Sequence, residues 1–333
     1  MAALTPRRLA GEFSSFKGTL NGELLIFMKK SWINAVKAEH IITEYSGQLA
    51  GDISSTGSAL DKTKIVIEPP HGWQALDLRE IWRYRELLYF LAWRDVKVRY
   101  KQTAIGATWA VLQPFLTMVV FSIIFGRLIG VPTDGAPYAV FSYTALLPWN
   151  FFSGALTRSG NSLIYDSNLI SKVYFPRLIL PFASVLSLLI DFGIAFIILI
   201  GMLVFFGITP GISILALPLF LMLAFMTALG IGLWLSALNV KYRDFTHVIP
   251  FLAQFWLFLT PVAYSSTIIP ERWQLIYSLN PMVAVVEGFR WALLGQQNLP
   301  WMAMGFSSMV VLALFISGVF YFRRMEVEFA DVV

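Results

Sequence analysis

Residues 179–206, with the sequence ILPFASVLSLLIDFGIAFIILIGMLVFF, decide the fold class of this chain. Only one of their side chains, that of Asp191, is charged. An α-helix rises about 1.5 Å per residue, so about 20 apolar residues cross the roughly 30 Å hydrocarbon core of a bilayer. The stretch exceeds this minimum and therefore predicts a membrane-spanning helix.

Five other charge-poor runs are long enough to extend the prediction to six spans. They cover residues 107–126, 138–157, 214–238, 248–267 and 302–322. Gly207-Ile-Thr-Pro-Gly211 separates the third span from the fourth, because glycine and proline interrupt helices. Hydrophobic residues make up 57% of the chain and charged residues 14%, whereas globular domains contain about 25% charged residues. The sequence thus predicts an all-α integral membrane protein with six transmembrane helices, and excludes a water-soluble enzyme.

Positive charges gather on one side of the six predicted spans. That side holds Arg94, Lys97, Arg99, Lys101, Arg158, Lys172, Arg177, Lys241, Arg243, Arg323 and Arg324, and the other holds Arg127, Arg272 and Arg290. Because cytoplasmic loops of membrane proteins are enriched in Lys and Arg, this asymmetry places both termini in the cytoplasm. This orientation agrees with an even number of spans. Because membrane orientation accounts for the positive charges, the net charge does not indicate nucleic-acid binding.

The polar parts of the chain flank the membrane domain. Residues 1–68 are predicted to form a cytoplasmic N-terminal extension, flexible in part, and residues 326–333 a cytoplasmic tail. Residues 69–104 contain an amphipathic helix with aromatic residues at its borders, a pattern typical of the membrane interface. Residues 105–325 are the membrane domain. Four cations of the amphipathic helix are expected to face lipid headgroups, namely Arg94, Lys97, Arg99 and Lys101.

Two pairs of opposite charges have helical spacing. Asp95 and Arg99 are spaced to pair within the interfacial helix. Glu287 and Arg290 lie in residues 268–300, where apolar stretches too short to cross the bilayer predict short re-entrant helices between spans five and six. Their pairing is expected to hold this region together.

The sequence lacks the residues that energy-converting or metal-dependent chemistry requires. It contains no G-x-x-x-x-G-K-[ST] phosphate loop and no cysteine, and its three histidines have no ligand spacing. The chain is therefore predicted to bind no metal and no ATP, and any energy must come from a partner or an ion gradient. Asp191 is the one acid well inside a span, which makes it either a functional group or a polar contact between helices.

Two further sets of residues are candidates for function. Residues 161–177, between spans two and three, suit a short helix on which a soluble partner could dock, although a plain interfacial loop explains them equally. Aromatic side chains are frequent in the spans, either as interfacial belts or as pore-facing rings that stack on sugars. The candidate pore aromatics are Trp109, Phe115, Phe121, Tyr143 and Trp149.

Several short blocks, in one order, resemble the permease subunits of ABC type-2 polysaccharide exporters, the O-antigen, teichoic-acid and capsule group. They are Arg94-Asp-Val-Lys-Val-Arg-Tyr-Lys101, Gly106-Ala-Thr-Trp109, Gln113-Pro114, Leu147-Pro-Trp149, Asn168-Leu-Ile-Ser-Lys-Val-Tyr-Phe-Pro-Arg177, Tyr242-Arg-Asp244, Thr260-Pro-Val262 and Asn280-Pro281. The resemblance covers about residues 70–325 and leaves residues 1–68 outside it.

The resemblance implies a homodimer of this chain in the bacterial inner membrane, bound to two ATPase subunits that hold ATP and Mg. It also implies that the 163–176 loop is a coupling helix and that the channel exports a lipid-linked polysaccharide. The basic interfacial helix suits a pyrophosphate-linked lipid and anionic membrane lipids. The residues implied to contact the ATPase are Leu163, Asn168, Leu169, Ile170, Lys172, Tyr174, Phe175 and Arg177.

Three other functions compete with this interpretation. The nearest is an ABC type-2 exporter of a drug or small lipid. A proton-coupled secondary transporter that uses Asp191 would usually show internal repeats, and the two halves of this sequence are not similar to each other. A membrane glycosyl- or acyltransferase would require a cluster of acids or histidines at one interface, which the loops lack.

Overall fold

The computed structural model describes residues 82–101, 106–133, 135–173, 175–295, 301–326 and 329, without the side chains of residues 106–111, Glu271 and Ala303. All of these residues belong to the second of the two units into which the chain divides, Pro70–Val333. The predicted N-terminal extension and the start of the predicted interfacial helix lie outside the described residues.

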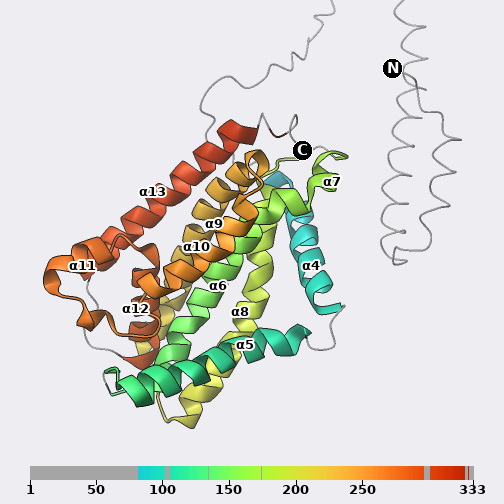
Figure 1. The fold of residues 1–333 in the computed structure, drawn as a ribbon. Coiled ribbons are helices and arrows are strands. Elements are labelled where there is room, and N and C mark those ends of the chain that lie inside the picture. Colours follow the sequence, from blue (N-terminus) through green and yellow to red (C-terminus); the bar gives the residue numbers. More distant parts are fainter. Residues whose placement is uncertain are drawn as a thin grey trace, which may run out of the picture. The chain divides into compact units, whose positions relative to one another are not determined.

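Every regular element in the described part of the chain is a helix, in agreement with the predicted all-α class (Figure 1). The elements are α4 Arg85–Lys101, α5 Gly106–Phe121, a π-helix Ser122–Ile129, α6 Tyr138–Tyr165, α7 Ser167–Ile170, α8 Ile179–Phe205, a 3-10 turn Ile212–Ala216, α9 Leu217–Lys241, α10 Phe245–Leu259, a 3-10 turn Ser266–Ile268, α11 Glu271–Tyr277, α12 Pro281–Leu294 and α13 Trp301–Glu326.

Four helical stretches are long and apolar enough to cross a membrane. They are Leu112–Ile129, Ile179–Phe205, Ile212–Lys241 and Met304–Glu326, and they overlap the predicted first, third, fourth and sixth spans. Helix α6 has 28 residues but carries several polar side chains, so it is long enough without meeting the same standard of hydropathy. The chain is therefore a multi-pass helical membrane protein.

The predicted fifth span, 248–267, is wrong in its second half. Helix α10 ends at Leu259 and has 15 residues, which is only about 22 Å of helix at 1.5 Å per residue. Thr260 adopts an extended backbone because the following Pro261 disfavours a helical conformation at the residue before it. The chain then turns towards α11 and α12, the two short helices that the sequence predicts between spans five and six.

Helix α6 is the centre of the bundle. It packs against α8, α9, α10 and α12, and its buried residues include Phe141, Tyr143, Phe152 and Leu156. Helix α4 lies along α8, and α5 crosses α6 and α8 near the end of the bundle opposite α7 (Figure 1). The fold therefore brings α4, the end of α6 and the start of α8 together beside α7.

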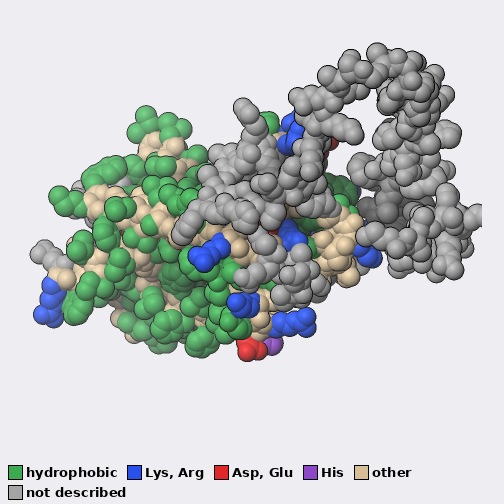
Figure 2. Space-filling model, turned by 90° about the horizontal axis from the view of Figure 1, so that it is seen from above, with side chains coloured by type: hydrophobic (Ala, Val, Ile, Leu, Met, Phe, Trp, Pro, Cys, Tyr) green, Lys and Arg blue, Asp and Glu red, His purple; other side chains and the backbone are tan. Residues whose placement is uncertain are grey.

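The outer surface of the bundle suits lipid. Large apolar side chains such as Ile197, Val204, Phe258 and Met309 are exposed on helices α8, α10 and α13. Seen from above, apolar side chains predominate on the part of the described surface that is visible, and several Lys and Arg side chains lie near its centre (Figure 2). Such apolar exposure is stable in a bilayer and not in water.

Helices α9 and α13 approach closely at a pair of glycines. A Cβ atom on Gly318 would lie 2.2 Å from the Gly230 carbonyl oxygen. Nearby, the rings of Trp234 and Tyr321 stack at 4.0 Å, and the Trp234 indole donates to the Ser317 hydroxyl at 3.2 Å. Small residues that let backbones touch are a common basis of helix association in membranes.

Replacing Gly318 with alanine is therefore expected to lower stability, because the added methyl group forces α9 and α13 apart. We expect a loss of about 1–3 kcal/mol, the usual range for overpacking, measured as a lower unfolding temperature of the detergent-purified protein. Gly305→Ala on the same helix is the matched control, since its Cβ would meet nothing within 4 Å. Equal unfolding temperatures of Gly318→Ala and Gly305→Ala would show that α9 and α13 do not pack closely at Gly230 and Gly318.

Candidate functional site

The segment between α6 and α8 presents a small exposed surface at one end of the bundle. Helix α7, Ser167–Ile170, is four residues long and is followed by a turn that leads into α8. Asn168 and Lys172 are exposed, Leu169, Ile170 and Arg177 are half-buried, and Tyr174 lies outside the described residues. Leu163 and Phe175 are buried within the chain, so of the predicted contact residues these two are not on the surface.

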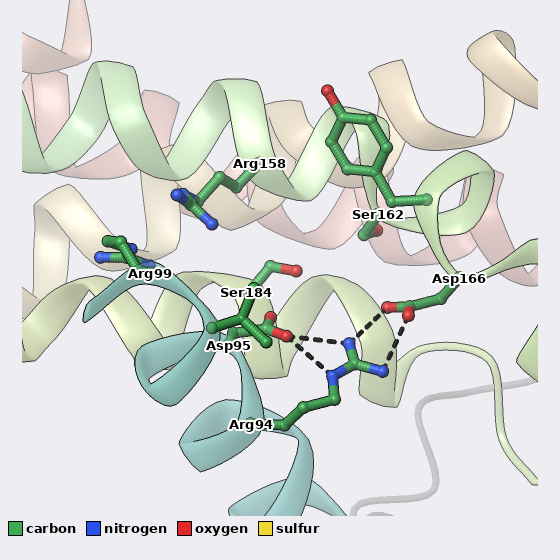
Figure 3. Close-up of a pocket in the computed structure, with 9 residues that line it drawn as sticks. Arg94, Asp95, Arg99, Arg158, Ser162, Asp166 and Ser184 are labelled. Carbon is green, nitrogen blue, oxygen red and sulfur yellow. Dashed lines mark hydrogen bonds and ion pairs between the residues drawn. The ribbon is translucent and has the colours of Figure 1, made fainter. Parts of the chain in front are cut away.

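Arg94 of α4 links this segment to the rest of the bundle. Its guanidinium donates to Asp95 at 2.8 and 3.0 Å, and to Asp166, at the start of α7, at 2.8 Å (Figure 3). Burial alone would lower the pKa of Arg94, but the hydrogen bonds and charges of Asp166 and Asp95 outweigh it and raise the pKa. Arg94 thus binds two carboxylates, and through Asp166 it connects α4 to the segment between α6 and α8.

Arg99, one turn further along α4, contacts the middle of α8. It forms an ion pair with Asp191 and donates to the Ser187 hydroxyl at 2.9 Å, and the neighbouring Tyr100 hydroxyl also donates to Asp191. Asp95, which the sequence spaces to pair with Arg99, forms an ion pair with Arg94 of the same helix, whereas Arg99 turns towards α8. Arg94 and Arg99 are directed at protein carboxylates, whereas Lys97 and Lys101 are exposed.

A cavity of about 290 Å³ opens between α4, α6 and α8, beside these ion pairs. The residues around it include Arg94, Arg99, Arg158, Ser162 and Ser184 (Figure 3). Arg158 extends from α6 towards Arg99 in this view. Burial, followed by the charge of Arg158, lowers the pKa of Arg99 to about 10, so Arg99 remains cationic at neutral pH.

Asp95 and Asp166 also line the cavity, and Arg99 is paired with Asp191, so Arg158 is the cation on which binding of an anion would depend. Two guanidinium groups that raise each other's electrostatic energy are stabilised when a negatively charged group enters between them, and guanidinium matches phosphate oxygens in geometry. Ser162 of α6 and Ser184 of α8 also line the cavity, and the Ser162 hydroxyl donates to the Ser159 carbonyl oxygen at 2.7 Å. The sequence contained a signal for Arg158, a cation at the end of an apolar run, but only the fold reveals that it faces Arg99.

At the opposite end of the chain's helical core, Arg290 holds the turn after α10. Arg290 is fully buried and pairs with Glu287 at 3.1 Å, which is the interaction that the sequence predicts. It also donates to the carbonyl oxygens of Tyr264 and Val262 at 3.1 and 3.0 Å, and lies 3.7 Å from the centre of the Phe141 ring. Arg290 therefore connects α12, the turn after α10, and α6.

Comparison with known proteins agrees with this architecture. The ABC-2 type transporter family matches residues 86–294, which extend from α4 to the end of α12. The chain belongs to the ABC-2 type transporter family. The resemblance predicted from the sequence blocks is thereby confirmed at the level of the family.

Several relatives in this family are similar over most of their own length. O-antigen export system permease protein RfbA of Myxococcus xanthus is 31% identical over 75% of this chain and 96% of the relative. The RfbA protein of Klebsiella pneumoniae is 27% identical over 74% and 95%. Inner membrane transport permease YadH of Escherichia coli K12 is 27% identical over 56% and 76%.

Family membership determines the role of the chain. An ABC-2 membrane subunit is a permease without ATPase activity of its own, and it works with an ATPase partner. The apolar helices and the relatives locate this ABC-2 permease in the bacterial inner membrane.

The candidate pore aromatics of this ABC-2 permease have different environments. Tyr143 and Trp149 are buried in the core, where the Tyr143 hydroxyl lies 3.4 Å from the Ala195 carbonyl oxygen and the Trp149 ring packs on Phe152. Phe115 is exposed and Phe121 half-buried, in the helical stretch that crosses the end of the bundle. The side chain of Trp109 lies outside the described residues.

Proposed function

We propose that this chain is the permease of an ATP-driven exporter that moves a lipid-linked, O-antigen-like polysaccharide across the inner membrane. The observation that carries the proposal is the similarity to two RfbA proteins over nearly their full length, both named as O-antigen export permeases. The cavity beside Arg99 and Arg158 supports it, because a polysaccharide carried on a lipid phosphate presents an anion at the membrane surface.

In this proposal the chain has six spans, with α6 and α10 as the second and fifth, and both termini in the cytoplasm. The 15 residues of α10 are completed by the turn and the short helices α11 and α12, which re-enter from the outer side. The positive charges of the loop segments support the orientation. Two copies of the chain form the channel, and two ATPase subunits bind on the side of α7.

The α7 segment is then the contact for the ATPase. We name residues 166–178 the coupling loop. Its exposed and half-exposed side chains, among them Asn168, Leu169 and Lys172, suit a protein partner, while Arg94 ties its first residue to α4. A displacement of the loop would reach α8 through α4, since Arg99 joins α4 to Asp191.

The test is export by the purified permease and ATPase in vesicles loaded with a lipid-linked O-polysaccharide. We expect ATP-dependent appearance of the glycan on the opposite side, and a loss of at least about tenfold in the Leu169→Asp variant, because a buried unpaired carboxylate at the contact weakens ATPase binding by 1.4 kcal/mol or more. Gln274→Asp on α11 is the control, since its side chain is exposed far from α7.

The competing substrate class is a drug or small lipid, which the same family scaffold could carry. The same vesicles distinguish the two, since glycan-free lipid phosphate or a hydrophobic dye replaces the polysaccharide in parallel assays. ATP-dependent transport of these compounds without transport of the glycan would reject the polysaccharide assignment. Normal export by Leu169→Asp would reject the role of the coupling loop.

A further inference from the structure

The C-terminal part of the coupling loop, at Arg177, forms hydrogen bonds with the C-terminal end of α13. The Arg177 backbone N–H donates to Glu326 Oε1 at 3.0 Å, and the Arg177 guanidinium donates to the backbone carbonyl oxygen of Glu326. The other carboxylate oxygen of Glu326 pairs with Arg323 at 3.2 Å. A single carboxylate thus connects two segments that lie 149 residues apart in the sequence.

The position of this carboxylate is favourable for the helix that follows. Helix α8 begins at Ile179 and has no side-chain hydrogen bond at its N-cap. The first N–H groups of a helix lack internal partners and carry partial positive charge, so a carboxylate nearby is stabilised there. The Ile179 and Leu180 N–H groups of α8 already donate to the carbonyl oxygens of Pro176 and Arg177, so Glu326 contributes its charge near this end of the helix and not a cap.

Phe329 extends the contact beyond the end of α13. It is buried, its ring packs edge-on against Phe322 at 5.4 Å, and the Arg177 guanidinium lies 5.8 Å from its ring centre. Arg177 is thus held by a carboxylate, a carbonyl oxygen and an aromatic ring, all from the C-terminal end. These contacts are part-buried, which makes them less screened than a surface ion pair.

Between its ends the coupling loop packs on the core through Leu169, Ile170 and Phe175, and its middle is exposed. Ser171, Lys172 and Val173 are exposed, and α7 between the two ends is a single turn. Two polar contacts add to this packing and fix the ends of the loop, at Asp166 by Arg94 and at Arg177 by Glu326. A loop fixed at both ends moves together with the helices that fix it, whereas a loop fixed at one end can bend without moving them.

We infer that the C-terminal end of α13, through Glu326, positions the coupling loop and makes α13 a second path by which loop movement enters the membrane helices. This inference rests on the proposed coupling function of the loop. Glu326 acts through Arg177 and is a positioning residue, since it lies behind the loop and not on its exposed surface.

The structural part of the inference is tested without the ATPase. Because the chain has no cysteine, Phe175→Cys introduces a single thiol at a buried position of the loop. Maleimide labelling of this thiol is expected to accelerate at least about tenfold when Glu326→Ala is added, the factor that corresponds to loss of one hydrogen bond to a charged group. Arg324→Ala, an exposed change two residues away, is expected to leave the rate unchanged.

The functional part is tested in the assembled transporter, with ATP hydrolysis and export measured together. Glu326→Ala is expected to keep the ATPase bound but to lower the export per ATP at least about twofold, as mutations that alter coupling do. Glu326→Gln retains an acceptor for the Arg177 N–H and is expected to lie between alanine and the parent. If Glu326→Ala does not yield folded protein, Glu326→Gln and its labelling rate decide the question.

The outcomes separate the two proposals. Unchanged labelling in Glu326→Ala would overturn the positioning role, whatever the transport result. Faster labelling with unchanged export per ATP would support the positioning of the loop by Glu326. It would overturn the role of α13 as a second path for loop movement. Normal export by Leu169→Asp would contradict the coupling function of the loop. The proposed function would then no longer include ATPase contact at residues 166–178.

Discussion

Replacing Arg290 with methionine is expected to prevent the permease from accumulating as a folded protein. The change leaves the Glu287 carboxylate without its cation and the carbonyl oxygens of Val262 and Tyr264 without a donor. Breaking a buried ion pair from one side is destabilising by about 3–5 kcal/mol, a large share of the roughly 5–15 kcal/mol that stabilises an ordinary domain. The measurement is the yield and unfolding temperature of the monodisperse protein in detergent.

Three variants make this expectation specific. Arg272→Met, an exposed arginine of α11, is the control and is expected to behave as the parent protein. Glu287→Gln with Arg290→Met is expected to recover part of the loss, because no uncompensated charge remains. Arg290→Lys keeps the charge but lacks the planar guanidinium group that donates to several oxygens at once. Its unfolding temperature is therefore expected to lie between those of Arg290→Met and the parent protein. Normal stability of Arg290→Met would show that this contact does not hold the turn after α10.

Neutralising Asp191 is expected to destabilise the packing of α4 on α8. Asp191→Leu leaves Arg99 close to Arg158 without a carboxylate on α8. We expect a loss of about 3 kcal/mol, the low end for breaking a buried pair, since both side chains keep some exposure. In a double-mutant cycle with Arg99→Met, the double variant is expected to be more stable than the sum of the single effects.

The same residue decides between two energy sources. In vesicles that contain the permease alone, without ATPase or ATP, a proton gradient is expected to drive no flux. With the ATPase, Asp191→Asn is expected to lower export while the remaining export still requires ATP. Gradient-driven flux that disappears in Asp191→Asn would instead support the secondary transporter and reject the ATP-driven one.

The sequence predicted the apolar helices well because each is a local property of about 20 residues. The boundaries of α10 were the main error, because the hydropathy of residues 248–267 continues past Pro261 while the backbone does not. Glu287 and Arg290 were predicted as a pair because one turn of helix brings them together. The carbonyl oxygens and the ring around Arg290 come from other helices, which the spacing of residues does not reveal.

The candidate site was less accessible to prediction for the same reason. Asp191 stands out in the sequence as an acid in an apolar run, yet its partner Arg99 is 92 residues away. Arg94 and Arg99 were expected to face headgroups, because a helical wheel does not include the carboxylates of neighbouring helices. Arg158 and Glu326 are ordinary charges at span ends by sequence, and their roles follow only from the arrangement of α4, α8 and α13.

The ion pair between Arg99 and Asp191 has a consequence for synthesis of the chain. Helix α4 leaves the ribosome before α8, and the two residues are separated by 92 positions. At about 5–20 residues per second, roughly 5–18 s pass before Asp191 is available. During that interval α4 has no carboxylate on α8 to receive it, so its final docking is a late event that follows insertion of α8. The order of assembly is thus opposite to the order of translation for this helix.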